Sequence, residues 1–136
     1  MQDDNRKYAT DNNSLAKQVA HIVYAETLAT SLRVVEALTS MILNRAQKTN
    51  QSVADVISDA SVFESLNKDS ERNKYLVINE SSNKFQMCLR VATRMLHGNL
   101  GDMCWHATNF HHESCLPDWA VARGYVLCAD GILFYL

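Results

Sequence analysis

The sequence predicts a mostly helical α+β domain with a small antiparallel β-sheet toward the C-terminus. Two observations predict this class. Apolar residues recur at the spacing of amphipathic helices through about the first hundred residues, and this period ends at Gly101. Nearer the C-terminus, two runs rich in aromatic and β-branched residues flank Asp130-Gly131, which is typical of a β-hairpin.

The individual elements follow from apolar stripes and from the capping residues that precede them. Helices are predicted over Leu15–Leu28, from Thr30-Ser31 to Gln47, from Ser52 to Asp59, and over Phe85–Leu96 before Gly98. A polar loop is predicted over Asn67–Lys74, and the hairpin strands over Tyr125–Cys128 and Ile132–Leu136. Residues 1–14 are expected to form a polar N-terminal segment, and residues 15–136 a single domain.

Length and composition exclude several classes of protein. The chain has 136 residues, of which 47% are hydrophobic and 21% charged, so it is large enough to bury a core without a metal or a disulfide. Its longest run without an acidic or basic residue, Met103–His112, is about half the length of a membrane-spanning helix. The net charge of −2, without a long basic cluster, gives no support to nucleic-acid binding. We therefore expect a monomer that neither inserts into a membrane nor binds nucleic acid.

Glu26 lies on the wrong side of its helix for a surface carboxylate. On a helical wheel it falls within about 40° of Leu15, Val19 and Ile22, so it shares the apolar stripe of the first predicted helix. It also lies in the last turn, where the helix dipole and partial desolvation both disfavour a charged carboxylate. A general acid that works near neutral pH needs a carboxyl group that keeps its proton, which both effects favour. The alternative is that the helix ends early and Glu26 reaches solvent.

Arg45 lies in the same way on the apolar side of the second predicted helix, near Val34, Leu38 and Met41. A buried guanidinium needs a specific partner, either a carboxylate or backbone carbonyls. The alternative is a side chain whose stem covers apolar surface while its charged end reaches water.

An ordered set of short motifs resembles the SleB/CwlJ-type cell wall hydrolases over about Leu15 to Leu136. The motifs are Ile22-Val23-Tyr24-Ala25-Glu26, Met41-Ile42-Leu43-Asn44-Arg45, Val62-Phe63-Glu64-Ser65, Ala107-Thr108-Asn109-Phe110-His111, Pro117-Asp118-Trp119, and Gly131 before Phe134-Tyr135. The resemblance implies a lysozyme-related fold and a peptidoglycan hydrolase or lytic transglycosylase. It also implies that Glu26, the residue already found on the helical wheel, is the catalytic acid.

The remaining motif residues are assigned by the same resemblance. We expect substrate-binding roles, as aromatic platforms and hydrogen-bonding groups for sugar rings, for Phe63, Asn109, His111, Trp119 and Tyr135. Asn44 and Arg45 are expected to give structural support. Two positions depart from the family pattern. Thr27-Leu28-Ala29-Thr30 replaces an Ala-Arg-Gly-Glu-like stretch, so its acidic residue is missing, and Ile132 replaces a histidine.

The absent second acid bears on the reaction. Hydrolysis of a glycosidic bond usually uses two carboxylates, whereas a lytic transglycosylase needs one acid, because the muramic acid 6-hydroxyl attacks its own anomeric carbon. We therefore expect cleavage of the β-1,4 bond between N-acetylmuramic acid and N-acetylglucosamine by transglycosylation, with no cofactor and no metal. Candidates for a second carboxylate are Glu64 and Asp118, with Asp55, Asp59 and Asp130 left open.

Three other interpretations remain at the level of sequence. Cys104, His106, His111, His112 and Cys115 are zinc-ligand types close together, although their spacing matches no standard zinc motif. Cys104 with a nearby histidine would suit a cysteine peptidase. A non-catalytic module that binds glycan or a protein partner is the third.

The cysteines and the N-terminus raise the question of location. The opening residues lack the apolar middle region of a secretory signal, and a chain that is not exported normally keeps its cysteines reduced. Cys104 and Cys115 would be able to pair outside the cell. The expected site of action is the bacterial cell wall, reached by a route that the sequence leaves open, such as phage-type release, another secretion system or shortening of a longer chain.

Overall fold

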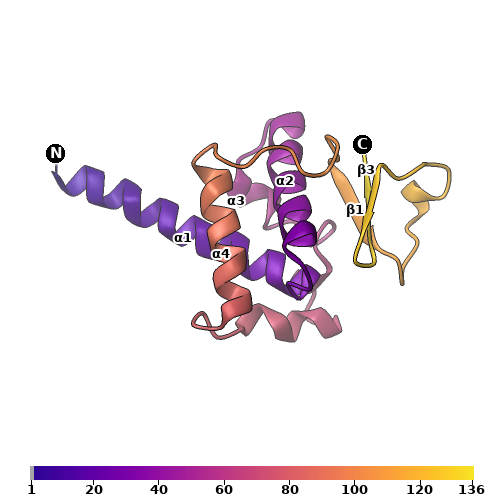
Figure 1. Ribbon diagram of the computed structural model, residues 1–136, viewed down its shortest axis with the longest axis horizontal. Coiled ribbons are helices and arrows are strands. Elements are labelled where there is room, and N and C mark those ends of the chain that lie inside the picture. The colour runs from indigo at the N-terminus through magenta and orange to yellow at the C-terminus, as the bar shows by residue number, and fades with distance from the viewer. Residues whose placement is uncertain (1) are drawn as a thin grey trace.

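The computed structural model describes the backbone of residues 2–136 and the side chains of residues 13–136. Helices form the larger part of the chain, and a three-stranded antiparallel sheet lies beside them at the C-terminal end (Figure 1). The predicted α+β class is confirmed. None of the described helices is long and apolar enough to cross a membrane.

The first helix, α1, runs from Gln2 to Thr27, and its N-terminal part projects beyond the other elements (Figure 1). The predicted start near Leu15 is therefore wrong. Asp11 to Ser14 favour N-caps, but residues 2–14 contain no glycine or proline, and nothing else in them stops a helix. The helix ends as Leu28 and Ala29 take left-handed backbone angles, with φ of 55° and 50°.

Helices α2 and α3 begin at the predicted serine caps, whereas α4 begins two residues before the predicted Phe85. Helix α2, Leu32–Thr49, starts after Ser31, whose side chain accepts a hydrogen bond from the Val34 N–H. Helix α3, Val53–Val56, starts after Ser52 in the same way but ends three residues before the predicted Asp59. Helix α4, Asn83–Leu96, is followed by Gly98 with a φ of 73°, the left-handed angle at which glycine commonly ends a helix.

Two 3-10 helices lie between α3 and α4. The first, η1, is Glu64–Leu66, and the second, η2, is Glu71–Val77. The prediction of a polar loop over Asn67–Lys74 is therefore wrong in its second half. Short 3-10 helices have no 3.6-residue apolar period, so periodicity in the sequence does not reveal them. Because η2 packs against α1, it brings Arg72 to the end of α1.

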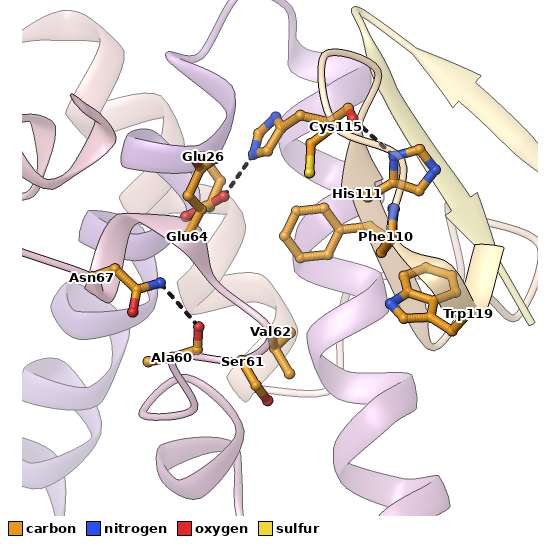
Figure 2. Close-up of a pocket in the computed structure, with 12 residues that line it drawn as sticks. Glu26, Ala60, Ser61, Val62, Glu64, Asn67, Phe110, His111, Cys115 and Trp119 are labelled. Carbon is orange, nitrogen blue, oxygen red and sulfur yellow. Dashed lines mark hydrogen bonds and ion pairs between the residues drawn. The ribbon is translucent and has the colours of Figure 1, made fainter. Parts of the chain in front are cut away.

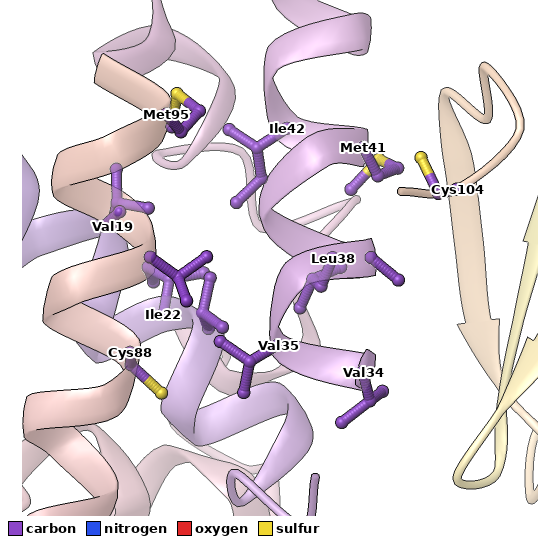
Figure 3. Close-up of a cluster of buried hydrophobic side chains, with 14 of the residues drawn as sticks. Val19, Ile22, Val34, Val35, Leu38, Met41, Ile42, Cys88, Met95 and Cys104 are labelled. Carbon is purple, nitrogen blue, oxygen red and sulfur yellow. The ribbon is translucent and has the colours of Figure 1, made fainter. Parts of the chain in front are cut away.

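The hydrophobic core lies among α1, α2 and α4 (Figure 3). Helix α1 contributes Val19 and Ile22, and α2 contributes a stripe that includes Leu38 and Ile42. These residues are those of the predicted apolar faces. The core therefore holds α1 against α2 and α4, and fixes the direction in which the C-terminal end of α1 points.

The sheet has the strand order β1-β3-β2. The predicted hairpin is present as β2, Leu127–Ala129, and β3, Ile132–Tyr135, joined through Asp130 and Gly131, which both have positive φ. The other neighbour of β3 is β1, Asn109–His112, which the sequence did not predict as a strand. A further 3-10 helix, η3, Asp118–Ala120, lies between β1 and β2 in the sequence.

Candidate active site

The Glu26 carboxylate is enclosed at the C-terminal end of α1. Glu26 is 1% exposed, which confirms that it lies on the buried stripe of its helix. Its Oε2 accepts a hydrogen bond of 2.7 Å from the backbone N–H of Ser65, at the start of the 3-10 helix η1. The Arg72 guanidinium donates to the Glu26 main-chain carbonyl at 3.2 Å, so it provides a hydrogen bond to a free carbonyl in the last turn of α1. It makes no hydrogen bond to the Glu26 carboxylate.

The other oxygen of Glu26 meets a histidine from the sheet. His112 Nε2 lies 2.8 Å from Glu26 Oε1, across 86 residues of sequence. Side chains alternate along β1, so Phe110 and His112 point to the buried face, and Asn109 and His111 to the other. The pairing of β1 with β3 thus directs His112 at the end of α1.

The carboxylate and the imidazole open onto a pocket of about 240 Å³ (Figure 2). Aromatic rings and polar side chains share its wall, which is the mixture that sugar rings require. The lining residues are Glu26, Ala60, Ser61, Val62, Glu64, Asn67, Phe110, His111, His112, Cys115, Pro117 and Trp119.

Two of the five predicted substrate-binding residues, His111 and Trp119, line this pocket. His111 Nδ1 lies 2.8 Å from the His112 carbonyl oxygen, which only accepts, so Nδ1 bears the hydrogen. Nε2 of the same ring lies 2.8 Å from the Tyr135 hydroxyl, within hydrogen-bond distance. Trp119 packs edge-on against both rings, and Tyr135 therefore supports His111 from behind without lining the pocket.

The other two predicted residues face elsewhere. Phe63 is fully buried and packs against Phe110, with ring centroids 5.6 Å apart, so it backs the pocket wall instead of forming its surface. The Asn109 side chain accepts from Arg45 and donates to the Leu136 carbonyl, and it does not line the pocket. Sequence motifs do not separate a residue that contacts substrate from one that supports it.

Asn44 and Arg45 connect α2 to the segment that leads into β1. The Arg45 guanidinium donates to the Thr108 carbonyl at 3.0 Å and to Asn109 Oδ1 at 2.7 Å. These partners are a backbone carbonyl and an amide, not a carboxylate. Asn44 Nδ2 donates to the Ala107 carbonyl at 3.1 Å. Both helical residues therefore fix the start of the strand that presents His112.

Asp102 organises the loop before β1. Its carboxylate accepts hydrogen bonds from Asn44 Nδ2 and from the backbone N–H groups of Cys104 and His106. Burial raises the pKa of Asp102, but these hydrogen bonds outweigh it and hold that pKa below the ordinary value of an aspartate. The ionised carboxylate is thus part of the native loop.

The candidates for a second carboxylate are placed very differently. Glu64 lines the pocket and lies 3.5 Å from Arg72 Nε. Asp55, Asp59 and Asp118 do not line it.

A second depression, of about 280 Å³, is also lined by Glu26 and His112. Asp130 and Glu113 line it together with Arg72. Thr30 donates to Asp130 Oδ2 at 2.7 Å. Hydrogen bonds from Ser31 and Thr30 hold the pKa of Asp130 below its ordinary value. The ionised carboxylate of the hairpin thus connects β2–β3 to the segment that follows α1.

The cysteine and histidine cluster is dispersed in the structure. His106 pairs with Asp102, His111 with Tyr135 and His112 with Glu26. Within residues 13–136, no group of three or more His, Cys, Asp or Glu side chains is arranged to hold a metal ion. Cys104 and Cys115 are both free thiols. Burial raises the pKa of Cys104 to about 12, which is the opposite of what a nucleophilic cysteine requires.

The model of one family, Cell Wall Hydrolase, matches residues 31–135. The chain belongs to this family, the SleB/CwlJ-type cell wall hydrolases. Membership makes it a hydrolase of the cell wall, with peptidoglycan as its substrate. Searches of curated proteins and of solved structures gave no match.

The family match begins after Glu26, so the place of Glu26 in this cell wall hydrolase rests on the structure. The elements that enclose its carboxylate, η1 and β1, both lie inside the matched residues. Sequence reasoning missed the contact of His112 with Glu26 and named His112 only among the possible zinc ligands. The available signal was strand alternation, which would have placed His112 on the same face as Phe110 had β1 been recognised.

Proposed function

We propose that this cell wall hydrolase cleaves the β-1,4 bond between N-acetylmuramic acid and N-acetylglucosamine, with Glu26 as the general acid and base. The observation that supports this most directly is the enclosed Glu26 carboxylate at the edge of a pocket lined by Phe110, Trp119 and polar side chains. A carboxylic acid removed from water is suited to deliver a proton to a leaving glycosidic oxygen.

The lining of the pocket supports a glycan as the part of peptidoglycan that is bound. Trp119 is 39% exposed, so part of its indole is available to stack on the apolar face of a sugar. Asn67 and Ser61 add amide and hydroxyl groups for the hydroxyl edges of the ring. The catalytic residue and the stacking surface thus lie on one pocket.

Lytic transglycosylation is the form of the reaction that we propose. Glu26 protonates the leaving oxygen, and the 6-hydroxyl of the same muramic acid attacks the anomeric carbon and returns its proton. One acid completes this cycle, and the family's acidic residue after Glu26 is replaced by Thr30 here. The proposed site of action is the bacterial cell wall, and the reaction needs no cofactor.

Substitution of the acid tests the function. Glu26→Gln preserves the shape of the side chain but removes the acidic proton, so we expect clearing of purified peptidoglycan to fall by about 10²- to 10⁴-fold. Glu71→Gln is the matched control, because Glu71 is exposed and lies outside both depressions. Melting temperatures of both variants show whether the fold is kept. Clearing by Glu26→Gln at the parental rate would refute the proposal.

Analysis of the products tests the form of the reaction. Transglycosylation gives 1,6-anhydromuramic ends, which are lighter by one water than hydrolysed ends. Digestion in ¹⁸O-labelled water followed by mass spectrometry should find no label at these ends. Labelled reducing ends throughout would require a carboxylate that activates water or forms a covalent intermediate, and Glu64 and Asp130 are the first to substitute. Sedimentation with peptidoglycan without cleavage would identify a binding module.

A further inference from the structure

The Glu26 carboxylate is shielded from solvent. Its side chain is 0% exposed, and each oxygen is engaged, one by the Ser65 N–H and the other by His112 Nε2. The His112 side chain is 9% exposed. A change in the protonation of Glu26 therefore changes its hydrogen bond to His112 directly.

The contact between Glu26 and His112 needs a hydrogen atom between the carboxylate oxygen and the imidazole nitrogen. A carboxylate oxygen and an unprotonated imidazole nitrogen both accept, so a separation of 2.8 Å between Oε1 and Nε2 is favourable only with a hydrogen between them. A neutral imidazole with its hydrogen on Nε2 donates that hydrogen to the Glu26 carboxylate. When the pair holds one further proton, it is either a carboxylic acid beside a neutral imidazole or an imidazolium beside a carboxylate. The last two forms contain the same number of protons, so the further proton belongs to the pair and not to one residue alone.

The pair also lies where the two depressions meet. Glu26 and His112 are the two residues that line both the pocket with Trp119 and the depression with Asp130. A glycan strand that extends from one depression into the other passes this pair. The scissile bond would then lie beside the shared proton.

We propose that His112 is a positioning residue that holds the catalytic proton jointly with Glu26. This inference rests on the proposed function, because it concerns the acid of the same reaction. The pair begins with one shared proton, which moves to the glycosidic oxygen as the bond from that oxygen to the anomeric carbon breaks. A carboxylate and a neutral imidazole remain. The muramic 6-hydroxyl oxygen then bonds to the anomeric carbon, and its proton restores the pair.

The surroundings of the pair contain charges of both signs. Arg72 favours loss of the shared proton, while the nearby carboxylates favour its retention. The other titratable groups that line the two depressions are Glu64, His111, Cys115, Glu113 and Asp130. These groups are the same in the parent and in a His112 variant, so a comparison of the two isolates the contribution of His112.

The pH dependence of cleavage tests this inference. An ordinary imidazole retains its proton to about two pH units above an ordinary carboxyl group. In His112→Gln the proton must be held by Glu26 alone, so the alkaline limb of the rate profile should move to lower pH by about one to two units. The rate at pH 7 should fall by about tenfold or more, with little change in the half-saturating substrate concentration. The control is His97→Gln, because His97 is exposed at the end of α4, away from both depressions.

A second measurement needs no change at His112. Imidazole signals followed by NMR in the parent and in Glu26→Gln report the titration of His112 directly. We expect its midpoint to fall by about one unit or more in Glu26→Gln, because the carboxylate partner is lost. An unchanged midpoint, or a parental pH profile in folded His112→Gln, would overturn the inference. If Glu26→Gln is inactive while these results are unchanged, the proposed function stands without the shared proton. A fully active Glu26→Gln would instead refute the proposed function itself.

Discussion

Replacing Arg45 by methionine tests how the strand that presents His112 is held in place. Arg45→Met keeps most of the apolar stem but removes hydrogen bonds of 3.0 Å to the Thr108 carbonyl and 2.7 Å to Asn109 Oδ1. Hydrogen bonds from a charged donor contribute about 1.5–3 kcal/mol each when buried, and half-exposure of Arg45 reduces this. We therefore expect the free energy of unfolding to fall by about 2 kcal/mol. For a domain of this size, the melting temperature should then fall by about 6–8 °C.

Thermal and urea unfolding followed by circular dichroism measure this loss. Arg90→Met is the matched control, because Arg90 is exposed on α4 and its guanidinium forms no hydrogen bond or ion pair with residues 13–136. In a double-mutant cycle, Asn109→Ala should show a coupling energy to Arg45 of about 1 kcal/mol. If the melting temperature of Arg45→Met equals that of the control, Arg45 does not hold the strand and the reasoning is refuted.

Three further predictions use other parts of the site. The exposed Cys115 and Cys128 should react with iodoacetamide in the native protein, whereas the buried Cys104 should react only after unfolding. Because Cys115 lines the pocket, its alkylation should block cleavage, and cleavage by Cys115→Ser should resist iodoacetamide. Trp119→Ala should raise the half-saturating peptidoglycan concentration about threefold to tenfold, measured by turbidity, and an unchanged value would remove Trp119 from the binding surface. Because folding lowers the pKa of Asp102, this carboxylate stabilises the fold above its pKa in the unfolded chain, and the stabilisation is lost as pH falls through its lower pKa in the folded protein. In urea titrations at a series of pH values, Asp102→Asn should therefore show a smaller loss of unfolding free energy at acid pH.

The sequence by itself determined the helical framework and the location of the acid. Apolar periodicity and the serine caps at Ser31 and Ser52 identified α2 and α3, because these signals act within a few residues of chain. The burial of Glu26 followed from its position on the same stripe as Val19 and Ile22. The Asp130-Gly131 turn identified the hairpin, because its positive φ angles favour these residue types.

The tertiary structure alone decided what surrounds that acid. Strand β1 exists because it pairs with β3, and its four residues contain no local signal strong enough to predict a strand. Without β1, His112 has no defined face, and its contact with Glu26 joins residues that lie 86 positions apart. The same distinction separates Trp119, which lines the pocket, from Phe63, which is buried behind it. Periodicity and capping report local backbone preferences, whereas the enclosure of Glu26 depends on long-range packing of α1 against η1 and β1.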